Sequence, residues 1–328
     1  MLPRDTDWVG TPPIKCQGIK TKLVPFIFRS VIWRPEGDDR WIEPFFGSGV
    51  VALNLAPARD LLADSNEHIV RLYRAIKDDE LTPSRAREYL QHHGRLLELG
   101  GAEYYYEVRE RFNHGGSSLD FLFLNRSCFN GVIRFNRKGA FNVPFGHKPG
   151  RFTQAYTTKI VNQVAWAARQ MRGRRWQILH QPWEQTLGMA RKGDFVYLDP
   201  PYIGRHTDYY DSWDERDAAR LAERTLALPC GFAASMWLEN RHRRNDHIAE
   251  HWNGVELRVC THFYHVGSTQ DLRNEIDEAL LIRQDRPHRT RANSARSARQ
   301  RRLPLRPGWR CSAMQRSTSC SGPRARFA

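Results

Sequence analysis

The sequence predicts an α/β fold with a parallel sheet and a ligand site at the carboxyl ends of its strands. Three apolar, β-rich segments each run into residues that terminate a strand. They are 40–46 before Gly47-Ser48-Gly49, 60–63 before Asp64, and 195–198 before Asp199-Pro200-Pro201. Ligands bind beyond the carboxyl ends of the strands in an open α/β sheet, so these three ends are expected to meet at one site.

The Asp199-Pro200-Pro201-Tyr202 segment carries the most specific chemistry. Two prolines forbid the ladder from continuing and stiffen the backbone. The segment offers a carboxylate, the Pro200 carbonyl and the aromatic face of Tyr202. Two acceptors and a ring suit a planar base that carries an amino group. A proline-stiffened turn without a ligand is the alternative for these four residues alone.

The glycine loop at 47–49 is compatible with two classes of cofactor. It lets the backbone approach a ligand closely, and with Ala52 it fits the dinucleotide fingerprint G-x-G-x-x-A. A nicotinamide-dependent oxidoreductase is therefore one alternative. Asp64 is placed to bond the ribose hydroxyls or the adenine of either cofactor. A helix N-cap beside Ser65 and Asn66 is the competing interpretation of Asp64.

Two other segments complete the predicted site. Residues 14–20 form a polar, glycine-containing loop ahead of a helical pattern, which places amides and Lys20 near a carboxylate. Residues 132–135 and 140–143 flank Asn136-Arg137-Lys138-Gly139, which predicts a β-hairpin with a basic tip. Arg and Asn side chains on such a ribbon suit a DNA groove. Solvated surface structure is the alternative for both segments.

The remaining elements follow from periodicity and from turn signals. Helices are expected at 69–79, 83–99 (stopped by Gly100-Gly101), 104–112, 159–171 and after a capping box Ser212-x-x-Glu215. Strands are expected at 176–180, 231–236, 255–264 and 278–282. Residues 265–274 are expected to link the last two strands, and residues 203–211 to form a lid. By this count the fold ends near residue 285.

These motifs, in this order, resemble those of the Dam-like DNA adenine-N6 methyltransferases, the D12 class of the alpha group. Residues 14–20 resemble motif X, Glu43 to Gly49 motif I, and Asp199 to Tyr202 motif IV. The span 125–146 is similar to the target-recognition segment, with N-R-x-x-F/Y-N-G-x-x-R and F-N-V-P-F-G. The resemblance covers residues 12–284.

The resemblance implies a Rossmann-like, S-adenosylmethionine-dependent methyltransferase sheet with an inserted helical and β-hairpin target-recognition domain. The catalytic domain would comprise 1–66 and 176–285, and the insertion 67–175. The tail 286–328 matches nothing in this family, and its Pro, Ser and Arg content with few apolar residues predicts a basic disordered segment. The resemblance also implies S-adenosyl-L-methionine as methyl donor, without a metal. The expected cofactor contacts are Cys16, Lys20, Glu43, Phe45, Gly47, Gly49, Asp64 and Asp199, with Cys16 at a position where these proteins often have Trp.

By the same resemblance, Asp199 and Pro200 accept the N–H groups of a flipped-out adenine on which Tyr202 stacks. Asn130 and Arg134 are expected to read bases, and Lys15, Arg137 and Lys138 to bind DNA as well. The last two are assigned to phosphates. An RNA adenine-N6 or a DNA cytosine-N4 methyltransferase shares this catalytic geometry and stays an alternative.

Charge and composition agree with a nucleic-acid partner. The net charge is +15, and twelve arginines with no acidic residue lie between Arg286 and Ala328. Double-stranded DNA is the expected partner, together with a cognate restriction endonuclease. The six cysteines form no Cys-x-x-Cys pair, the first residues lack an apolar signal region, and no run of eighteen apolar residues occurs. A cytoplasmic protein outside the membrane is therefore expected.

Two further motifs are interpreted as structural. Pro229-Cys230 has the residues of a cytosine-C5 methyltransferase nucleophile but follows the Asp199 segment, so a buried core cysteine is expected. His247-Ile248-Ala249-Glu250-His251 matches a zinc-binding pattern. It has no third ligand in view, and no metal site is expected there.

Overall fold

A computed structural model describes residues 8–202, 213–240, 245–263 and 275–284. These residues form one mixed sheet in the order β3-β2-β1-β4-β5-β7-β6. Its strands are β1 (Trp41–Glu43), β2 (Arg59–Asp64), β3 (Arg175–His180), β4 (Phe195–Leu198), β5 (Gly231–Asn240), β6 (Glu256–Phe263) and β7 (Glu275–Arg283). Strands β1 to β5 pair in parallel, and β7 runs antiparallel between β5 and β6. The predicted α/β class is confirmed.

Strand β1 lies in the middle of the parallel part. Ile42 pairs with Leu61 of β2 on one side and with Val196 of β4 on the other. Consecutive side chains of a strand point to opposite faces, and both faces are buried here. Trp41 and Phe195 therefore belong to one core cluster, whereas Ile42, Leu61 and Val196 belong to the second. Asp199 follows β4 on the same face as Tyr197.

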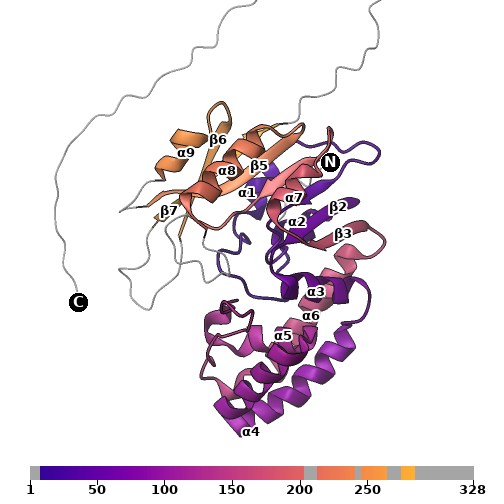
Figure 1. The fold of residues 1–328 in the computed structure, drawn as a ribbon. Helices are drawn as coiled ribbons and strands as arrows, with labels where there is room; N and C mark the ends of the chain where they lie inside the picture. The colour runs from indigo at the N-terminus through magenta and orange to yellow at the C-terminus, as the bar shows by residue number, and fades with distance from the viewer. Residues whose placement is uncertain (1–7, 203–212, 241–244, 264–274, 285–328) are drawn as a thin grey trace, which may run out of the picture. The chain divides into compact units, whose positions relative to one another are not determined.

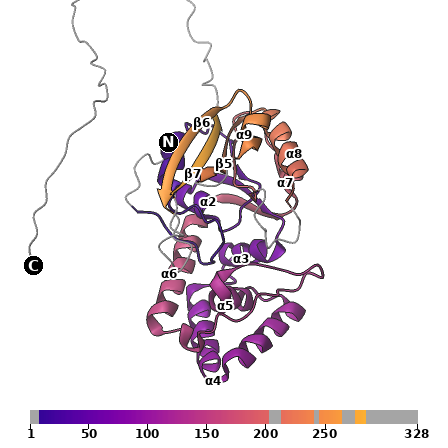
Figure 2. The same cartoon turned by 90° about the vertical axis from the view of Figure 1, so that its left-hand side faces the viewer.

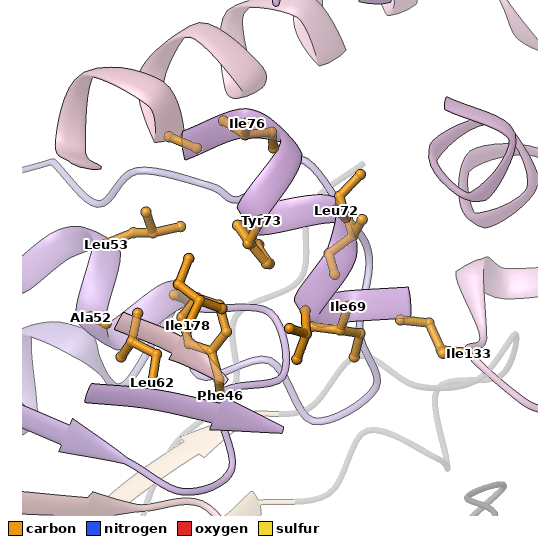
Figure 3. Close-up of a cluster of buried hydrophobic side chains, with 14 of the residues drawn as sticks. Phe46, Ala52, Leu53, Leu62, Ile69, Leu72, Tyr73, Ile76, Ile133 and Ile178 are labelled. Carbon is orange, nitrogen blue, oxygen red and sulfur yellow. The ribbon is translucent and has the colours of Figure 1, made fainter. Parts of the chain in front are cut away.

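Helices α1 (Val24–Ser30), α2 (Val50–Leu55) and α3 (Glu67–Lys77) cover the face that Trp41 occupies. Figure 3 shows Ile69, Tyr73 and Ile76 of α3 among side chains of α2 and of strands β2 and β3. Their spacing is the amphipathic pattern that predicted this helix. Asn66 caps α3 by accepting from His68 N and Ile69 N, so the N-cap is Asn66 and not Asp64.

The opposite face is covered by α7 (Trp183–Gly188), α8 (Glu215–Leu226) and α9 (Asp246–His251), which lie together over the sheet in Figure 1. The capping box of α8 differs from the predicted one. Asp214 accepts from Asp217 N at 2.9 Å, and Asp217 accepts from Asp214 N at 3.3 Å. Glu215 is the first helical residue, and Ser212 lies outside the described residues.

Helices α4 (Pro83–Gly115), α5 (Ser118–Ser127) and α6 (Gln154–Met171) follow α3 within the predicted insertion 67–175, and they group together in Figures 1 and 2. The expected stop at Gly100-Gly101 is confirmed, because the label α4 covers two helices separated by a non-helical break at Gly101. Gly101 has φ 57° and ψ −128°, and the helix resumes beyond it. Across this break, Tyr89 and Arg111 both bind the buried Asp120 carboxylate, which ties the two halves of α4 to α5.

The predicted β-hairpin at 132–143 forms a turn with isolated bridges and no strand ladder. Single antiparallel bridges join Phe135 to Phe141 and Cys128 to Phe145. Asn136 closes the tip, because its side chain accepts from Lys138 N and Ala140 N. Backbone bonds from Asn136 N to Ala140 O and from Asn142 N to Arg134 O lie on either side of the Phe135–Phe141 bridge, so the predicted hairpin is present as a short antiparallel turn.

Residues Met1 to Arg286 form one compact unit, in agreement with a fold that ends near 285. The predicted boundaries at 66 and 175 within this unit stay a prediction. The predicted lid at 203–211, the link at 265–274 and the tail from 286 lie outside the described residues. Among the helices of the described part, none is long and apolar enough to cross a membrane.

Candidate active site

A cavity of about 790 Å³ lies at the carboxyl ends of β1, β2 and β4. It collects most of the residues predicted for the cofactor and for catalysis. Those that line it are Cys16, Lys20, Glu43, Phe45, Gly47, Asp64, Asp199, Pro200 and Tyr202. Gly49 is not among the described lining residues. It caps α2 with φ 69°, and a Cβ there would lie 2.6 Å from the Phe46 ring.

Asp199 is held on one oxygen by two side chains. Its Oδ1 accepts from Lys20 Nζ at 2.8 Å and from Ser235 Oγ at 3.2 Å. Lys20 is 4% exposed, and Asp199 is 25% exposed toward the cavity. Burial opposes the charge on Lys20, but the Asp199 carboxylate outweighs it and raises the pKa of Lys20 well above its usual value. Lys20 therefore stays charged, and Asp199 lies in the wall of the cavity.

Two contacts fix the orientation of the Tyr202 side chain, one at its hydroxyl and one over its ring. Its hydroxyl donates to Glu278 Oε2 at 2.7 Å, and Lys20 Nζ lies 4.9 Å from its ring centroid. Burial raises the pKa of Tyr202, so the phenol stays neutral and keeps its donor. The ring is thus oriented before any base arrives.

The Asp64 carboxylate holds the glycine loop in place. Gly47 N donates to Asp64 Oδ2 at 2.7 Å, and the other Asp64 oxygen accepts from Asn66 N at 2.8 Å. Gly47 has φ 49°, and a Cβ there would meet no atom within 4 Å. The requirement for glycine is therefore its left-handed backbone, and the space beside the loop is open.

Glu43 is a buried carboxyl in the wall of the cavity. It accepts from Trp41 Nε1 at 2.7 Å. Burial raises the pKa of Glu43 to about 8, against the opposing effect of the Trp41 hydrogen bond. Asp60 is also buried, and burial raises its pKa well above the usual value. Both carboxyls favour protonation in the folded protein.

These shifts predict how stability changes with pH. Between pH 4.5 and about 8, Glu43 is protonated when folded and ionised when unfolded, so stability falls as pH rises through this window. We expect Glu43→Gln to remove a slope of about 1 kcal/mol per pH unit from the free energy of unfolding. Urea unfolding at pH 6, 7 and 8 measures it, with Glu36→Gln at an exposed site as the control. Parallel curves for wild type and Glu43→Gln would contradict the prediction.

An aromatic cluster forms another part of the wall. Phe45 stacks on Trp183 with centroids 6.3 Å apart and meets Trp213 edge-on at 5.7 Å. The Arg220 guanidinium lies 5.6 Å from the Trp183 ring and pairs with Glu184 at 3.0 Å. Only Phe45 of this cluster was predicted.

The turn of the recognition segment reaches the same cavity. Ile133, Phe135 and Gly139 line it, and Phe135 stacks on His68 of α3 with centroids 4.8 Å apart. Figure 3 shows Ile133 in the cluster around α3. Burial lowers the pKa of His68 to about 4, so this ring is neutral.

The predicted DNA-binding residues lie outside the lining of the cavity, at and around this turn. Asn130, Arg137 and Lys138 are exposed. Arg134 Nε donates to Asn142 Oδ1 at 2.8 Å, which sets the direction of its guanidinium. Lys15 is half-buried beneath the Asn130-Gly131 turn.

Sequence reasoning missed two residues that bind Asp199 and Tyr202. Ser235 and Glu278 lie on β5 and β7, far from residue 199 in the sequence. Ser235 is a polar residue in the apolar part of β5, which is an available signal because buried polar groups need partners. Glu278 follows other acidic residues at the start of β7 and gives no such signal. Tyr197 bonds Ser235 Oγ at 2.9 Å and is two residues from Asp199, so it shares its face.

The structural interpretation of Pro229-Cys230 agrees with the burial of Cys230, whereas the absence of a metal at 247–251 stays a prediction. Cys230 is buried in the second core cluster. Within the described residues, no three His, Cys, Asp or Glu side chains gather in a group that could hold a metal ion.

Comparison with known proteins now decides the family. The family model for the D12 class of N6 adenine-specific DNA methyltransferases matches residues 17–266. The chain belongs to this family. The methyltransferase is 33% identical to a DNA adenine methylase of Serratia marcescens over 224 residues, which covers 64% of this chain and 76% of that protein. A DNA adenine methylase of Salmonella typhi is 31% identical over 292 residues, 83% of this chain and 94% of its own.

A third relative is the type II methyltransferase M1.LlaDCHI of Lactococcus lactis, 30% identical over 227 residues, 65% of this chain and 75% of its own. The methyltransferase is therefore adenine-specific and acts on DNA, and its family implies S-adenosylmethionine as methyl donor. The nicotinamide alternative is overturned, although the Gly47-Ser48-Gly49 loop fits its fingerprint.

Proposed function

We propose that Asp199, Pro200 and Tyr202 receive an adenine flipped out of duplex DNA and direct its N6 amine at the methyl donor. The observation that supports this most is the Lys20–Asp199–Ser235 arrangement at the mouth of the cavity, with an oriented Tyr202 beside it. The exocyclic amine is a weak nucleophile because its lone pair is delocalised into the ring. Catalysis must therefore localise that lone pair.

Two hydrogen-bond acceptors localise this lone pair. Asp199 Oδ2 and the Pro200 carbonyl each take one N–H of the amine, which favours a tetrahedral nitrogen and points its lone pair along the transfer direction. Lys20 and Ser235 hold the carboxylate through its other oxygen, so little reorganisation is needed when positive charge develops on the amine. Tyr202 stacks on the base with a ring already fixed by Glu278.

The residues around the cavity suit the methyl donor. Its sulfonium supplies an electrophilic methyl group when bound. The open backbone of Gly47 and the loop from Cys16 to Lys20 would hold the amino-acid part, and Phe45 would pack on the adenosine. Asp64 fixes the glycine loop through Gly47 N, and its carboxylate, which is buried in the wall of the cavity, would accept from ribose as well. None of these contacts calls for a metal.

The test of this function is the identity of the methylated nucleoside. Purified protein is incubated with methyl-labelled S-adenosylmethionine and bacterial DNA that lacks adenine methylation. We expect the label in N6-methyladenine. Label in N4-methylcytosine, or label only in an added RNA, would replace this proposal by one of the two alternative methyltransferases.

A partner endonuclease is a finer proposal. The name of the Lactococcus lactis relative, a type II methyltransferase, supports a role in a restriction–modification pair. The test is protection: DNA methylated by this enzyme is expected to resist one sequence-specific endonuclease of the same host. Methylation at sites that no host endonuclease cuts would indicate an orphan enzyme instead.

Arg134 and Lys138 are proposed to divide base reading from phosphate binding. We expect Arg134→Ala to reduce discrimination between the preferred sequence and single-base variants by about tenfold or more, because an Arg contact to a base edge is specific. Lys138→Ala is the matched control and should weaken binding on all duplexes alike, with a smaller salt dependence. Binding titrations at two salt concentrations measure both. Uniform losses for Arg134→Ala would rule out base reading.

A further inference from the structure

Two asparagines fasten the N-terminal segment 10–20 through its backbone. Asn54 accepts from Gly10 N at 2.7 Å and donates to Gly10 O at 3.0 Å. Asn125 accepts from Lys15 N at 2.7 Å and donates to Lys15 O at 2.9 Å. Each amide thus pairs with both polar groups of one residue, as a neighbouring strand would.

Arg126 holds the stretch between these two points. Its Nε donates to Pro13 O at 2.7 Å and its Nη2 to Pro12 O at 3.3 Å and to Gln163 Oε1 at 2.6 Å. Asn125 and Arg126 belong to the predicted recognition segment, yet both are buried and bind the N-terminal segment. The backbone of residues 12 to 15 is consequently held by two side chains of the predicted recognition segment.

Asn125 also holds the turn that carries Asn130. Its Nδ2 reaches Gly131 O at 3.3 Å. Gly131 has φ 68°, and a Cβ there would lie 2.4 Å from Lys15 Cδ, so the turn rests directly on the Lys15 side chain. Asn125 is fully buried, and water cannot replace its three bonds. It therefore links Lys15 and the turn as one unit.

Five residues beyond Lys15, the same segment carries Lys20, which forms the ion pair with Asp199. Lys20 Nζ binds Asp199 Oδ1 at 2.8 Å and Gly18 O at 2.8 Å. The backbone of Lys20 is fixed as well, because its carbonyl accepts from Leu23 N and Val24 N at the start of α1. The short loop 16–19 is therefore held at both ends, at Lys15 by Asn125 and at Lys20 by Asp199 and the start of α1.

We infer that Asn125 is a positioning residue that couples the base-reading turn to the Lys20–Asp199 pair. A turn correctly seated on its target sequence keeps Lys15 in place through Asn125, and Lys15 keeps the loop that orients Lys20. A turn displaced by a wrong base disturbs the carboxylate that must accept the amine. Sequence selectivity is then expressed in kcat as well as in binding. This inference rests on the proposed function of Asp199.

The experiment compares Asn125→Ala with Asn54→Ala. The preferred sequence is first mapped from the N6-methyladenines that the wild type makes in unmethylated DNA. Then kcat and KM are measured on a duplex with that sequence and on duplexes with one base changed. We expect Asn125→Ala to lower kcat on the preferred duplex about tenfold and to leave the changed duplexes nearly unaffected, so that selectivity falls.

Asn54→Ala removes a matched pair of bonds from the same segment but does not touch the turn. It should lower the melting temperature without changing the ratio of kcat values. A double-mutant cycle adds a second readout: with Asn130→Ala in place, Asn125→Ala should cost clearly less kcat than it does alone. A merely structural Asn125 would give independent losses.

Several results would overturn the inference. These are a folded Asn125→Ala with wild-type kcat and selectivity, or losses that multiply in the cycle. Should the alanine variant not fold, Asn125→Asp is measured in the same way, because it keeps the acceptor for Lys15 N and removes the donor to Gly131 O and to Lys15 O. Failure of the proposed function itself would show in the wild type, as absence of N6-methyladenine, and not in the variants alone.

Discussion

Asp199→Ala is expected to lower kcat about 10³-fold while S-adenosylmethionine binding is largely retained. The variant loses the acceptor that, with the Pro200 carbonyl, localises the lone pair of the amine. Single-turnover methylation of duplex DNA measures the loss, and calorimetric titration measures cofactor binding. Because Lys20 is buried against this carboxylate, the alanine variant also leaves an unpaired cation, which lowers stability.

The stability effect and the chemical effect can be separated. Asp199→Ala combined with Lys20→Met removes both partners of the ion pair, so the melting temperature should recover. Activity should not recover, because the acceptor is still absent. Comparable methylation by Asp199→Ala and the wild type would show that another group localises the lone pair.

Tyr202→Ala is expected to lower kcat/KM for DNA about 10- to 100-fold, because stacking of a base on an aromatic ring contributes roughly 1–3 kcal/mol. Cofactor affinity should change far less. A duplex with a fluorescent adenine analogue at the target position reports flipping directly. The analogue should become bright with the wild type and much less so with Tyr202→Ala.

Tyr202→Phe and Glu278→Gln provide the controls for ring orientation. Phe keeps the stacking face and loses only the hydroxyl that donates to Glu278 at 2.7 Å. Gln keeps a neutral acceptor for that hydroxyl. Both variants should retain most of the activity, with losses below about tenfold. A Phe variant as impaired as the Ala variant would show that the hydroxyl, and not the ring, is what catalysis requires.

Local patterns predicted the strands and the ends that matter for function. A proline pair after β4 and a glycine loop after β1 each terminate a strand for reasons internal to a few residues. Their predicted meeting at one cavity is observed, because parallel strands bring their carboxyl ends to one edge. Helix α3 was also predicted correctly, from the helical spacing of its apolar residues.

Local patterns also predicted two features of the inserted segments. The helix expected to stop at Gly100-Gly101 leaves the helical conformation at Gly101, and a second helix follows. The hairpin expected at 132–143 is present around residues 136–139, with Phe135 bridging Phe141, but its pairing is too short to form strands. The helix cap before α8 was predicted less precisely, because Asp214 and Asp217 form the capping box in place of Ser212 and Glu215.

The sequence by itself determined which chemical groups this methyltransferase offers at its site, since Asp199, Pro200, Tyr202 and the glycine loop are contiguous motifs whose proposed roles follow from residue type and spacing. The tertiary structure alone decided how that chemistry is held in place. Ser235, Glu278 and Asn125 reach their partners across 36, 76 and 110 residues of chain. Such bonds follow from the order of strands and the packing of helices, which no local pattern encodes.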